Sequence, residues 1–585
     1  MENTSITNYI LVHDHSRFSL LERAPAELLR SIFNKVEPRD LRNLLLVSKT
    51  LHASAMSYLY EAVTYEVNCD DAAFLHDLQR LHRAGTNLKL VRSLAITIAG
   101  SPNRKKPLPE NVSMSSTGFW KDGYMFYKAC DLFNQHIVKI VQCTPFLRHF
   151  RLESVQIRVL EPQVNAGQML IPRKLKSIAT GGSYDLYQSY LSRDVLTTVV
   201  RKAIEERIDT LEELAVGQES WAAQSYRVSV NYLRSPAPWY LDDALAPATA
   251  SRQFSSLKKL RVISFNLRVT HPQDQMTLGQ VFRFDKLRSL TLESCFGSAQ
   301  FLGHLARLQG SSAMNLKEFV FRHEDATPTL VAHLEAFLCS FSGLEVLSIL
   351  MDNTDEHANL PNHERILKLH GLTLKVLVWC GRKRHRPSGM VSSEQRVAGR
   401  PSFLECLATY CSDIRELSIN LDVNTDYLSE GRWRRIAYGT PFFAIKFPRL
   451  TTLHIQALPC VNRLAVDPFF IAHANKAAIT KYLDWSNIYF GRDKYPSLKL
   501  IAVGPLNYMD RYLLNRPTRM RTKVGPAWPI FYDVTGVKNN FGCYDHILQT
   551  LGNFDNRQAI FINENVNNIQ QMYPNTRIFD FYWLK

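Results

Sequence analysis

The sequence predicts an α/β protein in which a three-helix unit precedes an irregular solenoid with one strand and one helix per repeat. Two observations carry this fold class: three helical patterns between residues 20 and 65, and a leucine pattern that recurs along residues 66–505. Hydrophobic residues make up 45% of the chain and charged residues 21%, which are ordinary values for a soluble globular protein. We expect residues 1–19 to form a flexible N-terminus and residues 506–585 to form a C-terminal cap or tail.

The first helix is expected to begin at Pro25, because a proline in the first turn leaves no N–H unsatisfied. Glu27 places a negative charge in that turn, where the helix dipole favours it. The apolar residues that follow have the spacing of one helical face: they are Leu28, Leu29, Ile32, Phe33 and Val36. Pro38 ends this helix and opens the next.

The second helix has its own apolar face, formed by Leu41, Leu44, Leu45 and Val47. Ser48 is a suitable N-cap for a third helix, which carries Leu51, Ala55, Leu59 and Tyr60. A unit of this size buries little surface on its own. Two interpretations follow from these residues alone: a cap that packs on the core of the chain itself, or an apolar surface that a partner covers.

The order and spacing of these residues match a known motif. The matching residues are Pro25, Glu27, Leu28, Leu29, Ile32, Phe33, Asp40, Leu41, Leu44, Val47, Ser48, Lys49, Leu59 and Tyr60. The stretch therefore resembles an F-box, with two departures: Ala24 replaces the usual leucine, and a usual tryptophan is missing near Leu51. The resemblance implies that the unit binds a Skp-type adaptor through Pro25, Leu28, Leu29, Ile32, Phe33, Leu41 and Leu44.

The leucine pattern L-x-x-L-x-[LIVFW] predicts a strand in each repeat, because residues two apart on a strand face the same side. Its copies begin at Val91, Leu147, Leu211, Leu257, Leu287, Leu316, Leu344, Leu374, Ile414, Leu450 and Leu498, and Leu175 with Ile178 forms a degraded copy. From Leu257 to Leu374 the copies are 30, 29, 28 and 30 residues apart. Longer intervals elsewhere indicate insertions.

Helical patterns lie between the copies, as at Leu302, Leu305 and Leu308, and at Leu330, Leu334, Phe337, Leu338 and Phe341. Leu132, Phe133, Ile137, Ile140 and Val141 form another. One strand and one helix in about 29 residues are typical of a leucine-rich repeat solenoid. Cys295 stands at the position where such repeats carry Asn or Cys to satisfy backbone groups in the turn. Coincidental leucine spacing in an unrelated α/β fold is the alternative.

Three insertions are expected in the repeat body, at residues 101–118, 218–255 and 381–400, because they are rich in turn-forming residues. The repeat pattern ends near residue 505. Ile547, Leu548 and Leu551 predict a helix in the tail, which we expect to close the last repeat.

No motif in the sequence indicates catalysis, since the chain has no G-x-S-x-G, no phosphate-binding loop and no H-E-x-x-H. The Asp422, Asn424 and Asp426 series lacks the glycine and the glutamate that a calcium loop needs. His13-Asp14-His15 is expected to be solvated rather than to bind a metal. We predict a protein that is not an enzyme and has no catalytic residue, no cofactor and no metal.

The sequence also bears on the compartment of the protein. Its ten cysteines are scattered and form no C-x-x-C pair, which favours reduced thiols in a cytoplasmic or nuclear protein. No apolar run approaches the length of a membrane span, and the N-terminus lacks the features of a signal peptide.

The formal net charge of +16 is compatible with nucleic acid or with acidic protein partners, but it is modest for 585 residues and no nucleic-acid-binding motif accompanies it. The basic cluster at residues 382–386 is either a nuclear import signal or a solvated loop, and Arg432, Arg434 and Arg435 are either a phosphate-binding surface or an ordinary repeat edge.

The F-box resemblance implies the substrate-recognition subunit of an SCF-type cullin–RING ubiquitin ligase. In that expectation the F-box binds the adaptor and the repeat body holds a target protein on the strand face. No membrane is expected as a partner, and nucleic acid is not favoured. The alternatives are a ligase-independent interaction scaffold, which the substitutions at Ala24 and Leu51 suggest, and a nucleic-acid-associated protein, which the charge suggests.

Overall fold

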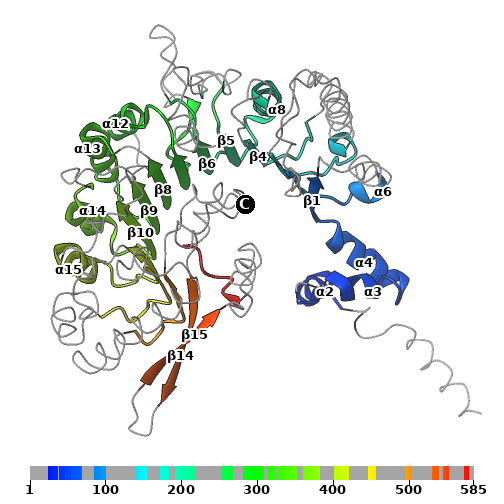
Figure 1. The fold of residues 1–585 in the computed structure, drawn as a ribbon. Helices are drawn as coiled ribbons and strands as arrows, with labels where there is room; N and C mark the ends of the chain where they lie inside the picture. The colour runs from blue at the N-terminus through cyan, green and yellow to red at the C-terminus, as the bar shows by residue number, and fades with distance from the viewer. Residues whose placement is uncertain are drawn as a thin grey trace, which may run out of the picture. The chain divides into compact units, whose positions relative to one another are not determined.

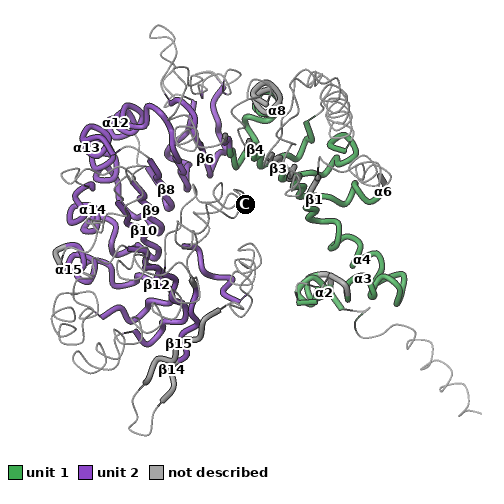
Figure 2. The backbone as a smooth tube through the Cα atoms, viewed as in Figure 1, with its two compact units in different colours: residues 1–215 green, residues 216–585 purple. Residues whose placement is uncertain are grey.

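The computed structural model divides into two compact units, residues 1–215 and residues 216–585 (Figure 2). The structure describes residues 21, 24–33, 35–36, 38–68, 85–99, 140–154, 171–182, 192–218, 241, 245, 252–267, 281–308, 314–323, 326–351, 360–381, 401–419, 446–455, 495–503, 530–538, 544–551 and 572–578. The predicted flexible N-terminus and the insertion at 101–118 lie outside these residues, and so does the insertion at 381–400 except for Gly381, which ends a strand.

The first unit begins with the three helices that the sequence predicts: α2 (Ala26–Phe33), α3 (Pro38–Leu44) and α4 (Lys49–Leu59) (Figure 1). Ser48 caps α4, since its Oγ accepts a hydrogen bond of 3.2 Å from the Leu51 N–H. The helices enclose a core of five buried residues, Leu29, Phe33, Leu41, Leu51 and Ala55. The unit therefore has its own small apolar centre.

The same unit continues into parallel strands that are paired in chain order. They are β1 (Ala62–Asn68), β2 (Ser93–Ala99), β3 (His149–Ser154) and β4 (Ser177–Gly182), with helices α6 (Gly85–Leu88) and α8 (Ser192–Arg207). Strand β5 (Glu213–Gln218) contains the boundary between the units.

The second unit pairs its strands in chain order as well. Its parallel strands are β6 (Lys259–Ile263), β7 (Ser289–Glu293), β8 (Glu318–His323), β9 (Val346–Met351), β10 (Val376–Gly381), β11 (Glu416–Ile419), β12 (Thr452–Ile455) and β13 (Leu500–Val503). Helices α12 (Ser298–Leu308), α13 (Pro328–Leu338), α14 (His363–His370) and α15 (Pro401–Tyr410) lie along one face of these strands (Figure 1).

Each predicted copy of the leucine pattern coincides with one of the strands β2 to β13. A repeated hydrogen-bond arrangement fixes their register. The carbonyl before one strand accepts two consecutive N–H groups from the next repeat, as Lys317 O does from Glu345 at 2.8 Å and Val346 at 3.0 Å. The same pair of bonds recurs on Arg288, Glu345, Lys375, Arg415 and Thr451. The body is thus a strand-and-helix repeat array, as the sequence predicts.

The core of the second unit lies between the strands and the helices. Phe319 on β8 packs against Phe337 on α13 with ring centroids 5.1 Å apart, and Leu290 and Leu292 on β7 are buried. Cys295 is buried as well, and its Sγ lies 3.3 Å from the carbonyl oxygen of Val262 in the preceding repeat. Val262 lies within β6, so the cysteine contacts a strand carbonyl rather than a turn carbonyl.

The prediction of a helix at Ile547, Leu548 and Leu551 is wrong. These residues belong to β15 (Tyr544–Leu551), which pairs antiparallel with β14 (Ile530–Lys538), and β14 pairs antiparallel with β13. The open edge of β14 explains the difference, because its unpaired backbone groups are satisfied by a neighbouring strand and not by a helix. The hairpin extends the sheet beyond the last repeat strand (Figure 1).

The predicted insertion at 218–255 includes core residues. Leu241, Leu245 and Phe254 are buried, so this segment supplies side chains to the body at the positions that the structure describes. Within the described residues, no helix has both the length and the apolar character needed to cross a membrane.

Candidate interaction surfaces

The structure divides the seven predicted adaptor-binding residues into three groups. Pro25 is exposed, and Leu28 retains 52% of its exposure. Ile32 and Leu44 are half-buried against the small core. The remaining three, Leu29, Phe33 and Leu41, are buried, so they hold the helices together and present little surface to a partner.

Two exposed apolar residues extend the candidate surface beyond the sequence prediction. Leu46 and Val47 lie in the turn between α3 and α4 and are 87% and 66% exposed. The sequence contained a sign of this exposure, because the four consecutive apolar residues from Leu44 to Val47 are more than one face of a short helix can bury. Exposed leucine and valine side chains without a cover are typical of a docking surface.

The two departures from the F-box pattern lie inside the three-helix unit. Leu51 is 1% exposed, and Ala24 is half-buried against the same core. Their effect is therefore on the packing of the unit rather than on the side chains that it presents.

An ion pair ties the helices to the strands of the first unit. The Nη2 of Arg30 on α2 lies 2.6 and 2.7 Å from the two carboxylate oxygens of Glu61, the residue before β1. The Arg30 side chain is 61% exposed, so the pair adds only modest stability, but it limits the orientation of α2 relative to β1.

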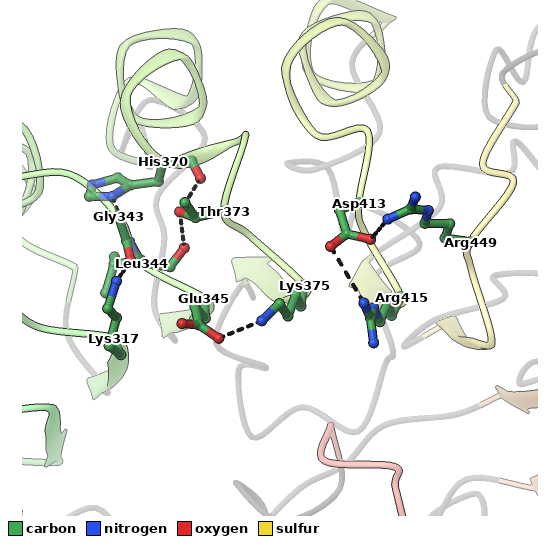
Figure 3. Close-up of polar contacts among 10 residues, drawn as sticks. All are labelled: Lys317, Gly343, Leu344, Glu345, His370, Thr373, Lys375, Asp413, Arg415 and Arg449. Atoms are coloured by element: carbon green, nitrogen blue, oxygen red, sulfur yellow. Dashed lines mark hydrogen bonds and ion pairs between the residues drawn. The ribbon is translucent and has the colours of Figure 1, made fainter.

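A polar edge runs along the residues that precede the strands of the second unit (Figure 3). Lys375 Nζ lies 2.6 Å from Glu345 Oε2, and Arg449 Nη1 lies 2.6 Å from Asp413 Oδ1. Hydrogen bonds from these cations lower the pKa of Glu345 and of Asp413. Cationic residues dominate the edge: they are Lys258, Arg288, Lys317, Lys375, Arg415 and Lys499.

Several of these cations contact groups within the chain. Lys317 Nζ donates to the Gly343 carbonyl at 3.2 Å, Arg288 Nη1 donates to the Asn315 carbonyl at 3.3 Å, and Arg415 pairs with Asp413. The donors of Lys317 and Arg288 join neighbouring repeats, whereas Arg415 and Asp413 belong to the same repeat. The edge therefore offers less free positive charge to a phosphate backbone than its composition indicates.

The face of the second unit that lies opposite α12–α15 is called here the opposite face. On this face, one residue from each of the strands β7 to β13 is paired in register with a residue of the next strand, and we call this set the middle row. It consists of Thr291, Val320, Ser348, Val378, Ser418, His454 and Ala502. All seven are buried. In the first unit the corresponding residues Ala95, Arg151 and Ala179 are only half-buried. The strands of the second unit are thus covered on both faces.

The C-terminal segment, residues 572–578, contributes to this cover. Figure 1 shows the segment, in red, on the side of the strands away from α12–α15. The segment contacts a second set of residues paired in register on the same face, two positions before the middle row in β8 to β13, which we call the first row. It consists of Glu318, Val346, Val376, Glu416, Thr452, Leu500 and Asp533. Ile578 is fully buried there.

Glu416 is the centre of this contact. Its carboxylate accepts hydrogen bonds from the N–H of Arg577 at 2.9 Å and of Ile578 at 2.6 Å. The residue is 5% exposed, and backbone donors are well suited to a buried carboxylate because they satisfy its lone pairs without a second charge. Arg577 Nη2 reaches Glu318 Oε2 at 2.7 Å, three strands away.

Other candidate chemistry is weak. Ser418 Oγ and His454 Nδ1 lie 2.7 Å apart, but both residues are fully buried between β11 and β12, so the contact satisfies two polar groups rather than facing a substrate. The described residues contain no group of three His, Cys, Asp or Glu side chains arranged to hold a metal. Burial raises the pKa of the Cys411 thiol to about 12, which keeps the thiol protonated and unreactive.

The comparisons with known proteins give no family for this chain. No protein-family model matches it. No curated protein matches it either.

Proposed function

We propose that this protein is a substrate-recognition subunit of an SCF-type cullin–RING ubiquitin ligase. In this proposal the α2–α4 unit is an F-box that binds a Skp-type adaptor, and the repeat body binds the target protein in the cytoplasm or nucleus. The exposed Leu28 on a compact three-helix unit carries the proposal, because an exposed leucine on a small self-contained unit favours a docking role.

Such a subunit performs no bond chemistry. It holds a target and a ligase on one chain, so that encounters between them become intramolecular and the effective concentration of the target rises. A docking role also agrees with the repeat array, since a solenoid presents an extended surface built from many short elements.

The burial of the helices refines the proposed contact residues. Pro25 and Leu28 are exposed enough to touch the adaptor, and Ile32 and Leu44 contribute their accessible edges. Leu46 and Val47 are added because they are exposed and apolar. Leu29, Phe33 and Leu41 act indirectly, by fixing the helices that carry these side chains.

The test is capture of a purified Skp-type adaptor by the full chain and by its Leu28→Asp variant. A charge on an exposed interface leucine is expected to weaken capture by about tenfold or more while the fold is retained, because Leu28 is 52% exposed. Leu372→Asp is the matched control, since Leu372 is 82% exposed and lies in the second unit. It should bind the adaptor as the wild type does.

If the wild-type chain fails to bind the adaptor, the ligase proposal is wrong and the interaction scaffold becomes the better account. If Leu28→Asp and Leu372→Asp bind equally well, the adaptor contacts another surface. A mobility-shift series in salt tests the nucleic-acid alternative, whose binding must weaken steeply as salt rises.

A further inference from the structure

We propose that the opposite face of the second unit is a docking site for a turn-forming peptide that carries arginine followed by an apolar residue, and that Arg577 and Ile578 occupy this site within the same chain. The inference deepens the proposed function, because it gives the chemistry of the target segment that the repeat body would bind. Only the identification of the docked peptide as part of a target protein rests on the proposed function, because the site itself is defined by contacts within the second unit.

The contacts along the segment follow the order of the strands. The Tyr573 hydroxyl donates to Asp533 on β14, and Thr576 Oγ1 lies 3.4 Å from Thr452 Oγ1 on β12. Arg577 follows with its N–H on Glu416 of β11 and its guanidinium on Glu318 of β8. Because these four contacted residues share one row of the sheet, the segment crosses the strands as a bound peptide would.

The backbone contribution is independent of side-chain identity. Glu416 accepts the N–H groups of two consecutive residues, and its two oxygens lie 2.9 Å from the Arg577 nitrogen. Two consecutive N–H groups point to the same side only where the backbone leaves the extended conformation, and a turn does precede this pair, because the Thr576 N–H bonds the Tyr573 carbonyl at 3.0 Å. Glu416 therefore supplies affinity for a main chain, while the neighbouring groups select the sequence.

The selection for arginine comes from charge and reach. Val346 and Val376 lie between Glu416 and Glu318 in the first row, so a side chain must pass over two strands to connect the two carboxylates. Arginine has both the length and the terminal donors for this. The guanidinium of Arg577 meets the Glu318 carboxylate, with Nη2 2.7 Å from Oε2.

The next residue is selected by burial. Ile578 is 0% exposed, which favours an aliphatic side chain after the arginine, because burial removes its apolar surface from water. Arg577, in contrast, keeps a side chain that is 46% exposed, so its ion pair is modest. One anchored apolar residue and one exposed ion pair form a contact that a second peptide can replace.

Hydrogen–deuterium exchange on the full wild-type chain tests the inference without mutation. The probe is the capped peptide MYPNTRI, which copies residues 572–578, and the control peptide is MYPNTAI. Saturating MYPNTRI is expected to speed exchange at the Arg577 and Ile578 amides of the chain, because the peptide takes their acceptor. MYPNTAI should leave both amides protected. Unchanged exchange with a saturating excess of MYPNTRI would overturn the inference.

A binding assay gives the second measurement. Arg577→Glu in the full chain places a carboxylate beside Glu318 and releases the segment, so labelled MYPNTRI should bind this variant about tenfold tighter than the wild type. Adding Glu318→Arg restores an ion pair within the chain and should remove the gain. Equal affinities within about twofold for wild type and Arg577→Glu contradict a shared site.

These outcomes are separable from those of the adaptor test. None of the variants touches residues 24–60, so adaptor capture should be unchanged in all of them. Loss of adaptor binding in the wild type would remove the ligase role and leave the peptide site standing, whereas failed peptide exchange would remove the site and leave adaptor binding intact.

Discussion

His370 shows how a single buried polar residue fastens two repeats together. It lies at the end of α14 and is 0% exposed. Its Nδ1 accepts the Leu344 N–H at 3.3 Å (Figure 3), so Nε2 carries the proton and donates to the Leu338 carbonyl at 2.9 Å. Only the neutral imidazole can make both bonds, and burial lowers the pKa of His370.

We predict that this residue makes the protein less stable in mild acid. The folded-state pKa of His370 lies below its unfolded value of 6.5, so the unfolded state binds the proton first. The stabilisation is complete above about pH 6.5 and decreases as the pH falls below that value. Denaturant unfolding should therefore give a lower free energy of unfolding at pH 5 than at pH 7.5.

The control for this prediction is His370→Gln, which keeps a polar side chain without a proton to gain. Its unfolding free energy should depend less on pH over the same range. Some dependence should persist, since burial also lowers the pKa of His304. The carboxyl groups of Glu345 and Asp413 have lowered pKa values and stay ionised in this range. An unchanged pH dependence in His370→Gln would contradict the assignment.

At the scale of elements, successive helices approach each other most closely where a side chain is missing. Gly371 follows α14, and a Cβ atom there would lie 2.5 Å from the Leu367 carbonyl oxygen and 2.5 Å from the Tyr410 carbonyl oxygen at the end of α15. Both neighbours are backbone atoms. The glycine is thus required by the close approach of two chain segments, not by its φ of −56°.

We predict that Gly371→Ala lowers the unfolding free energy by about 2 kcal/mol, because one of the two helix ends must move to admit the methyl group. The matched control is Leu372→Ala, since Leu372 is 82% exposed and should change stability by less than about 0.5 kcal/mol. Chemical denaturation of both variants measures the difference. Equal stabilities would mean that α14 and α15 shift apart at no cost.

The elements also show which parts of this fold a sequence can predict. The leucine pattern reports a local period, so it predicted the strands β2 to β13 without knowledge of their partners. Ser48 likewise predicted the start of α4 from a local signal. Strand β15 was missed because its pairing with β14 depends on an edge that the local sequence does not describe.

The candidate surfaces were predictable to a smaller extent. Apolar spacing identified Leu28 and Leu29 alike, and only the packing of the helices separates the exposed one from the buried one. The contact of Arg577 with Glu416 joins residues 161 positions apart, and no local pattern reports it. The run VLSILM in β9 was a usable sign of the covered opposite face, because strands buried on both faces lose the polar alternation.

At the scale of the whole molecule, the chain is divided into two compact units. Leu147 before β3 in the first unit and Leu347 in β9 of the second unit are both 0% exposed. In a repeat array, stability is approximately a sum of terms from each repeat and its neighbours. A core mutation should therefore be felt mainly within its own unit.

We predict that calorimetry resolves two unfolding transitions, and that each leucine truncation moves one of them. Leu147→Ala and Leu347→Ala should each cost about 3 kcal/mol from the lost apolar contacts and the cavity left behind. The two variants should lower different transitions. A single transition that both variants lower equally would show that the units unfold as one cooperative body.

The paired hydrogen bonds between repeats have a consequence for how this chain can change its length. Between Lys317 and Glu345 the chain advances 28 residues, and between Thr451 and Lys499 it advances 48, yet the same two N–H groups return to one carbonyl in each case. The pairing of the strands therefore does not depend on the number of residues that connect them, since closing a longer connection adds little entropy cost. Each connector is a place where new sequence can be accommodated while the sheet keeps its register.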